Sequence, residues 1–316
     1  MADEAPVLSI IVISYNTREM TLACLASVHA ETRTPFELIV VDNASTDGSA
    51  EAIAEAFPDV RLLAESTNHG FAPAHDLAVP LARAPWILLL NPDTVVLDGA
   101  LDKLLAFAEA RPEAGIWGGR TVYGDGELNP SSCWGRMTPW STFCRMTGLS
   151  GLLSRSEVFN SEAMGDWPRD SVREVDIVTG CLFLMRRADW DAMGGFDPVF
   201  FMYGEEADLC LRAREAGYRP AVTPEATIVH YGAASEKVKA DKMVRLLRAK
   251  ISLIDRHFAR GTRTLGRWML QAWPLSRALA FGVAARVRGR PDLRETAANW
   301  REIWSRRAEW RNGLEP

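Results

Sequence analysis

The chain has 316 residues, of which 47% are hydrophobic and 24% are charged, as in an ordinary soluble globular protein. Its five cysteines are scattered without C-x-x-C spacing, which argues against a zinc ribbon or a disulfide framework and favours a reducing compartment. The acidic N-terminus lacks a basic segment followed by an apolar one, so we expect a cytoplasmic protein without a signal peptide.

Charge is distributed unevenly along the chain. Residues 237–316 carry 19 Lys and Arg against seven Asp and Glu, whereas the first 236 residues carry 17 against 34. A basic tail on an acidic body predicts that the tail meets an anionic partner, such as phosphates, a membrane face or the body itself. We expect no nucleic-acid partner.

The first third of the chain alternates short apolar runs with amphipathic segments. Strands are predicted at 8–14, 36–41, 60–64 and 86–90, and helices at 18–30, 48–57, 72–81 and 100–110. This alternation predicts an α/β fold with a doubly wound, mostly parallel sheet, in which ligands bind beyond the carboxyl ends of the strands. Polar residues gather at those ends: Ser14-Tyr15-Asn16, Asp42 to Gly48, and Asn91-Pro92-Asp93.

The middle of the chain is less regular. Between residues 118 and 173 the periodicity fades, which predicts a loop-rich insertion that covers the site and receives the acceptor, or else a poorly ordered surface excursion. Strands are predicted again at 177–185 and 227–230, the second of which ends on His230.

Three carboxylates crowd into four positions at Glu205, Glu206 and Asp208. Because like charges repel, at least one of them should bind its proton more tightly than usual. A helix over 207–216 would place Asp208 beside Arg212 and both glutamates at the positive end of the helix, ionised and pointing outward. The alternative is a solvated acidic first turn.

The tail from residue 238 onwards is predicted to be helical and basic. A stripe at helical spacing near its end suits a membrane interface, but it could equally pack on the protein's own body or on a second subunit. Its residues are Leu293, Ala297, Trp300, Trp304 and Ala308. The apolar segment 265–287 contains Gln271, Pro274 and Arg277, so it is a poor bilayer span.

Together these motifs resemble family-two glycosyltransferases with the GT-A fold, and within them the rhamnosyltransferase-like branch. The motifs that carry the resemblance, across residues 7–258, are Ile11 to Asn16, Val40 to Gly48, Asn68 to Phe71, Leu90 to Asp93, Thr179-Gly180, Gly195 to Asp197, Glu205 to Asp208, and His230. The resemblance implies a nucleotide-sugar-binding half at 1–117, an acceptor and catalytic half at 118–236 and a helical basic tail at 237–316.

The resemblance assigns a group of residues to the nucleotide sugar: Ser14, Tyr15, Asn16, Asp42, Asn68, Asn91, Lys237 and Lys242. Asp42 would accept hydrogen bonds from the base or ribose, with the backbone near Ser14 and Tyr15 lining the same pocket. Asp42 could instead form an Asx-turn that caps the next helix. The two lysines would clamp the diphosphate, or else belong to a solvated basic helix.

A divalent cation, Mg²⁺ or Mn²⁺, is also implied by the resemblance. Asn91-Pro92-Asp93 stands where such enzymes often carry Asp-x-Asp, so Asp93 would be one metal ligand and His230 the second. Asparagine at the first position removes one ligand charge. The alternatives are a simple turn after the strand and a structural histidine.

Glu206 occupies the position of the catalytic base in the family pattern, with Glu205 before it and Asp208 positioning neighbours. The implied function is inverting transfer of a sugar from a dTDP-, UDP- or GDP-linked donor, with dTDP-rhamnose first, to a lipid-linked or polysaccharide acceptor. The enzyme would act as a peripheral protein on the inner face of the cell membrane. The alternative is a catalytically silent scaffold of the same fold that docks partners there. The oligomeric state is left open.

Overall fold

A computed structural model of the chain describes residues 5–232 and 239–315. The chain forms two compact units, and each is built from segments that are separated in the sequence. The first unit comprises Met1–Trp134, Pro168–Phe201 and Glu205–Ser235. The second comprises Gly135–Trp167, Met202–Gly204 and Glu236–Pro316. The sequence interpretation placed 135–167 in the catalytic half, whereas the structure groups these residues with the tail helices.

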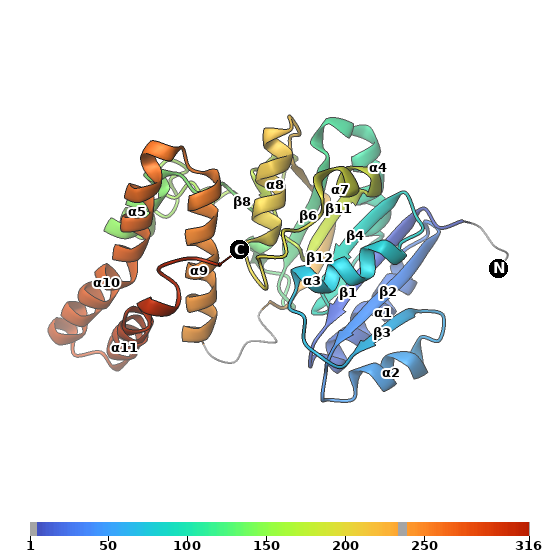
Figure 1. Ribbon diagram of the computed structural model, residues 1–316, viewed down its shortest axis with the longest axis horizontal. Helices are drawn as coiled ribbons and strands as arrows, with labels where there is room; N and C mark the ends of the chain where they lie inside the picture. The colour runs from blue at the N-terminus through green and yellow to red at the C-terminus, as the bar shows by residue number, and fades with distance from the viewer. Residues whose placement is uncertain (1–4, 233–238, 316) are drawn as a thin grey trace. The chain divides into compact units, whose positions relative to one another are not determined.

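The first unit is built on a ten-stranded mixed sheet (Figure 1). Along the main path the strands are β3 (Arg61–Glu65), β2 (Phe36–Asn43), β1 (Leu8–Ser14), β4 (Trp86–Leu90), β11 (Leu182–Arg186), β6 (Ile116–Val122), β12 (Ala221–His230) and β5 (Thr94–Val96). Two short strands extend it: β7 (Leu128–Asn129) pairs with β6, and β9 (Arg173–Glu174) pairs with β12. The first four strands are parallel, and β11 enters antiparallel to both β4 and β6.

Helices cover this sheet. They are α1 (Arg18–Glu31), α2 (Ser49–Ala56), α3 (Ala72–Ala78), α4 (Ala100–Ala110), α7 (Arg187–Met193) and α8 (Glu205–Glu215). All seven residues of β1 and all five of β4 are buried, which is the pattern of strands covered on both faces. A separate two-stranded sheet pairs β8 (Cys133–Trp134) with β10 (Ile177–Val178). The carboxyl ends of β1, β2 and β4 therefore open on one edge, where the polar motifs lie.

The predicted fold class is confirmed, and the bounds of β1, β4 and α4 agree with the prediction residue for residue. Two expectations about the middle of the chain were wrong. The irregular insertion expected from residue 118 instead begins with β6, which lies inside the sheet because all of its residues except Arg120 are apolar or small. The strand predicted at 177–185 is split into β10 and β11 by Thr179–Cys181.

The second unit is helical. Its helices are α5 (Pro139–Thr147), α6 (Leu149–Leu152), α9 (Lys239–His257), α10 (Arg263–Arg288) and α11 (Pro291–Ser305). Figure 1 shows α9, α10 and α11 lying side by side, around a core that includes Ile251, Leu270, Trp273 and Trp310. No helix in the described ranges is long and apolar enough to cross a membrane.

The stripe on α11 packs inward. Ala297 is fully buried, and Trp300 and Trp304 pack against the core of the helical unit. The rings of Trp300 and Trp273 are 5.3 Å apart between centroids. Of the alternatives for this stripe, packing on the protein's own body is correct for these three residues, and they do not offer an apolar face to a membrane.

Candidate active site

Asn16 joins the loops that follow β1 and β2. Its backbone N–H donates to Ser45 Oγ at 2.9 Å, and its Oδ1 accepts from the backbone N–H of Thr46 at 2.8 Å. Asn16 has φ of 53° and Ala44 has φ of 66°, so both loops turn through left-handed residues. Asn16 therefore holds the rim in place by contacts within the protein.

The other two predicted residues after β1 differ in their accessibility. Ser14 is fully buried, and its hydroxyl lies 2.9 Å from that of Thr21 on α1. Only the backbone of Ser14 is left to line a ligand site. Tyr15 is 39% exposed at the same edge, so its ring can meet a ligand.

Asp42 combines the two roles that the sequence left open. One carboxylate oxygen, Oδ2, accepts from the backbone N–H of Ser45 at 3.1 Å, which is the Asx-turn. The other oxygen, Oδ1, is buried and has no hydrogen-bond partner among the described residues. A buried acceptor without a donor is costly, so Oδ1 is suited to receive a hydrogen bond from a ligand.

Asn68 takes part in an amide network with Asn43, a residue that the sequence interpretation did not single out. Asn43 Nδ2 donates to Asn68 Oδ1 at 3.1 Å and to the carbonyl of Gly70 at 2.8 Å. Gly70 has φ of 86°, and a Cβ there would lie 2.4 Å from the carbonyl oxygen of Phe201. The backbone N–H of Phe71 donates to that same oxygen at 2.7 Å. The network thus ties the end of β2 to the segment just before the acidic motif.

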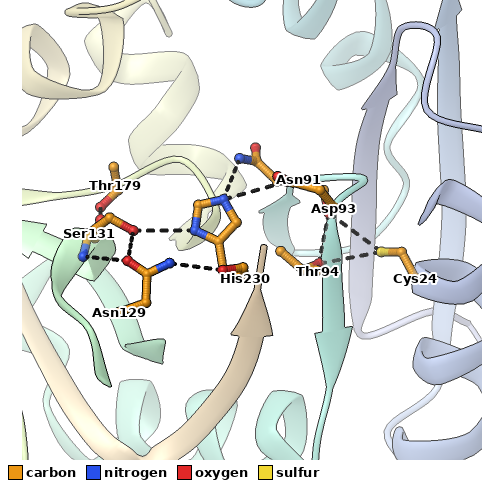
Figure 2. Close-up of polar contacts among 8 residues, drawn as sticks. All are labelled: Cys24, Asn91, Asp93, Thr94, Asn129, Ser131, Thr179 and His230. Carbon is orange, nitrogen blue, oxygen red and sulfur yellow. Dashed lines mark hydrogen bonds and ion pairs between the residues drawn. The ribbon is translucent and has the colours of Figure 1, made fainter. Parts of the chain in front are cut away.

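Asp93 and His230, predicted as metal ligands, lie together at the ends of β4 and β12 (Figure 2). The distance between Asp93 Oδ1 and His230 Nε2 is 3.5 Å. Asn91 Nδ2 is also 3.5 Å from His230 Nε2, and Asn91 Oδ1 is buried without a partner in the described chain. Both side chains of the pair are about one-tenth exposed.

A second layer orients the imidazole, and sequence reasoning missed it. Ser131 Oγ lies 3.3 Å from His230 Nδ1, and Asn129 Nδ2 donates to the His230 carbonyl at 2.8 Å (Figure 2). Thr179 in turn donates its hydroxyl to the Ser131 carbonyl. Asn129 and Ser131 fall in the irregular stretch before β8, where no periodic pattern marks them in the sequence.

Electrostatics at His230 favour a nearby positive charge. Burial lowers the pKa of its imidazole, but Cys181 and Asp93 outweigh burial and raise the pKa to about 10. A divalent cation would compete with this proton, because an imidazole binds a metal only in its neutral form. A carboxylate and an imidazole 3.5 Å apart can share one metal ion, leaving its other positions to ligand oxygens. No cluster of three or more His, Cys, Asp or Glu that could hold a metal occurs in the described residues.

The acidic motif forms the first turn of α8, where Glu205 and Glu206 have different surroundings. Glu205 is 4% exposed, and its Oε2 has no hydrogen-bond partner among the described residues. Burial first, and the charge of Glu206 second, raise the pKa of Glu205 well above its usual range. The expectation that one carboxylate binds its proton tightly is confirmed. The expectation that Glu205 points outward and ionised is wrong, because its side chain is enclosed by the fold.

Asp208 is fully engaged in positioning. Its Oδ2 accepts from Arg212 Nε at 2.7 Å, and the same guanidinium donates to the carbonyls of Met193 and Gly195 at 2.7 Å each. Asp208 thereby holds α8 against the turn that follows α7, and it lies beside Arg212 as predicted.

Of the two predicted lysines, only Lys242 is among the described residues. Lys237 lies outside the described residues. Lys242 is on α9 in the helical unit, with its ammonium 5.8 Å from the centre of the Tyr203 ring.

A shallow groove of about 500 Å³ opens beside the loop that follows β2. Its lining includes Arg18, a cation that the sequence interpretation did not consider.

Comparisons with known proteins agree with this arrangement. The family model described as "Glycosyl transferase family 2" matches residues 9–166. The chain is 30% identical over 240 residues to the N-acetylglucosaminyl-diphospho-decaprenol L-rhamnosyltransferase of Mycobacterium tuberculosis, covering 72% of this chain and 77% of that protein.

Two solved structures share the fold. One is a mannosyltransferase from Pyrobaculum calidifontis in complex with GDP-Man and Mn²⁺, with a TM-score of 0.58, 18% identity, and coverage of 97% of this chain and 88% of that one. The other is residues 1–349 of TarS from S. aureus in complex with UDP-GlcNAc, with a TM-score of 0.52, 15% identity, and coverage of 94% and 90%. The sheet, the polar edge and these similarities lead to one conclusion: the chain belongs to glycosyltransferase family 2, resembles its rhamnosyltransferases, and is a glycosyltransferase with the GT-A fold.

Proposed function

We propose that the protein transfers a sugar, with inversion, from a nucleoside-diphosphate donor to a lipid-linked or polysaccharide acceptor at the inner face of the cell membrane. The observation that carries this proposal is that three buried oxygens in the predicted donor and catalytic motifs have no hydrogen-bond partner among the described residues. These are Asp42 Oδ1, Asn91 Oδ1 and Glu205 Oε2. All three belong to motifs of the first unit that the family resemblance assigns to the donor or to catalysis.

The donor would be held at the ends of β1, β2 and β4. Asp42 Oδ1 would accept a hydrogen bond from the base or ribose while Oδ2 keeps its turn, and Asn91 Oδ1 would accept one from the ribose. Tyr15 is exposed enough to contact the base. The roles of Lys237 and Lys242 on the diphosphate remain a prediction, as do those of Ser14, Asn16 and Asn68 in the donor pocket.

Asp93 and His230 would hold Mg²⁺ or Mn²⁺, since an acidic oxygen and an imidazole nitrogen face each other there. Such a cation neutralises charge on a diphosphate leaving group. Ser131 would fix the imidazole ring so that Nε2 faces Asp93, and Asn129 would fix the backbone that carries it.

Glu206 would act as the general base. Glu205 retains its proton because it is buried and lies beside Glu206, which leaves the negative charge of the pair on Glu206. Glu206 would take the proton from an acceptor hydroxyl as the hydroxyl oxygen bonds to the anomeric carbon of the donor. The bond from that carbon to the diphosphate oxygen breaks on the opposite side, so the configuration inverts.

Rhamnose is our first choice of sugar, because the relative from Mycobacterium tuberculosis is a rhamnosyltransferase. The substrate in that relative's name, a decaprenol-linked diphosphate sugar, supports a lipid-linked acceptor here. UDP- and GDP-linked sugars stay among the candidate donors, since the two structural neighbours contain UDP-GlcNAc and GDP-Man.

The experiment is a donor panel of dTDP-rhamnose and of UDP- and GDP-linked sugars, assayed for hydrolysis and for transfer with Mn²⁺, Mg²⁺ or a chelator. We expect turnover of one donor, its loss with chelator, and a strong decrease in Asp93→Ala. The alternative result is that the protein binds a nucleotide sugar but neither hydrolyses it nor transfers the sugar to an undecaprenyl- or decaprenyl-diphosphate acceptor. That result would identify a silent scaffold.

A further inference from the structure

Helix α10 presents an apolar stripe that no part of the described chain covers. Five of the 16 large hydrophobic residues that are exposed in the described structure lie on this one helix. They are Leu265, Trp268, Leu279, Val283 and Val287, which are 50%, 60%, 62%, 59% and 80% exposed.

The stripe occupies one face of α10. Its positions are separated by three, eleven, four and four residues, and each of these steps is close to a whole number of helical turns. The opposite face is accounted for, because Leu270, Pro274 and Ala278 are buried. The exposed residues form two patches on this face, Leu265 with Trp268 and Leu279 with Val283 and Val287, because residues 269–278 are buried or half-buried. Exposed apolar patches on a unit whose core is already filled indicate an external partner.

The charge on α10 is of one sign. The helix contains five arginines and no aspartate or glutamate: Arg263, Arg267, Arg277, Arg286 and Arg288. Arg286, three residues after Val283, lies at the edge of the stripe, and Arg288 follows it at the end of the helix. Both are exposed, and neither forms an ion pair with a residue in the described ranges. Arginines beside apolar residues, together with an exposed tryptophan, match the boundary between anionic headgroups and acyl chains.

A second copy of the chain fits this face less well. Arg263, Arg267 and Arg277 contact the helical unit itself, so Arg286 is the arginine at the edge of the stripe. If two α10 helices met through their stripes, Arg286 would find no acidic residue on the other α10. An anionic surface satisfies both the apolar and the basic parts of the helix. The helix cannot cross the bilayer, so it would lie in the interface plane.

We propose that the exposed face of α10 is the surface by which the enzyme docks on an anionic membrane. This inference deepens the proposed function, because a lipid-linked acceptor requires the enzyme to work at a membrane. It also replaces α11, whose tryptophans pack inward, with α10 as the membrane-facing element of the tail.

The test is co-sedimentation of the full chain with vesicles of phosphatidylcholine alone and with 30 mol% phosphatidylglycerol, in low and high salt. We expect binding to the anionic vesicles only, with a roughly tenfold loss in the double variant Leu279→Ser, Val283→Ser, because each side chain adds apolar area to the interface. Arg286→Gln with Arg288→Gln should lower the anionic preference and its salt dependence. The matched control is Leu97→Ser with Val172→Ser, which replaces exposed residues of the same types in the first unit.

Equal vesicle binding by the wild type and the α10 variants would overturn the proposal, as would no binding by the wild type. Concentration-dependent dimers in sedimentation velocity without vesicles, abolished by the α10 variants, would show that a second copy occupies the stripe. Donor hydrolysis in solution is measured on the same variants. If donor hydrolysis is retained while vesicle binding fails, the membrane-docking inference is wrong and the proposed function still stands.

Discussion

The imidazole Nε2 of His230 lies 3.5 Å from Oδ1 of Asp93, at a point where the pairing of β12 with β5 brings distant parts of the chain together. Ser131 holds the other ring nitrogen at 3.3 Å. The pair is thus oriented before any ligand arrives, and its negative surroundings raise the pKa of the imidazole to about 10. A divalent cation placed here would relieve the same negative potential.

The first prediction concerns this pair. Asp93→Asn and His230→Gln should each weaken Mn²⁺ binding in the presence of a nucleoside diphosphate by at least about tenfold, because each removes one of two protein ligands. Calorimetry or Mn²⁺ electron paramagnetic resonance would measure it directly. Asp98→Asn is the matched control, since that carboxylate is exposed and pairs with Lys103. Unchanged Mn²⁺ affinity in both site variants would show that the metal lies elsewhere.

The second prediction separates the two oxygens of Asp42. Asp42→Asn can keep the acceptor that caps Ser45 but loses the charge offered by the second oxygen. We expect the donor KM to rise about tenfold, as for one hydrogen bond to a charged group, while Tm changes little. Asp42→Ala should raise KM and also lower Tm, because the turn is lost. A normal KM in Asp42→Asn would limit Asp42 to its structural turn.

The third prediction tests the contact between the donor loop and the acidic segment. Gly70→Ala places a methyl 2.4 Å from the Phe201 carbonyl oxygen, in addition to the strain of its positive φ. Gly126→Ala is a close control, since Gly126 has φ of 85° and open space around it. We expect Gly126→Ala to cost about 1–2 kcal/mol and Gly70→Ala distinctly more, by denaturant unfolding. Equal losses of unfolding free energy in the two variants would mean that the close approach of Gly70 to Phe201 does not affect stability.

The fourth prediction concerns the buried ion cluster of the helical unit. Burial would raise the pKa of Glu162, but Lys250 at 3.0 Å and Arg145 at 2.8 Å lower it to about 2. A depressed carboxyl pKa stabilises the fold above the unfolded value, and this contribution disappears as pH falls from about 4.5 towards about 2. Glu162→Gln should therefore be less stable at pH 7 and show a flatter fall of Tm between pH 5 and 3. A slope equal to that of the wild type would contradict this role.

Much of the first unit could be predicted from the sequence, because its strands are continuous apolar runs and its helices have clear periodicity. β1, β4 and α4 are examples, and the polar residues after β1, β2 and β4 marked the correct edge of the sheet. Local patterns contain this information, since a buried parallel strand needs apolar residues on both faces.

Other features depend on tertiary contacts that no local pattern shows. The apolar stripe on α11 predicts only that this face of the helix is buried against some partner. The structure shows that the partner is the core of the helical unit, including Trp273. Glu205 and Glu206 look equivalent in sequence, yet only the fold places Glu205 in the interior. Asn43 and Ser131 were missed because their roles arise from neighbours distant in the chain.

The central claim is that Glu206 removes the proton from the acceptor, and the most direct measurement is kcat for Glu206→Gln and Glu205→Gln in one transfer assay. Glutamine keeps the size of a neutral carboxyl group, so Glu205→Gln mimics the protonated Glu205 and should retain most activity. Glu206→Gln should lose about 10²–10⁴-fold in kcat with little change in donor binding. A Glu206→Gln enzyme with the wild-type kcat, or a large loss confined to Glu205→Gln, would contradict the account.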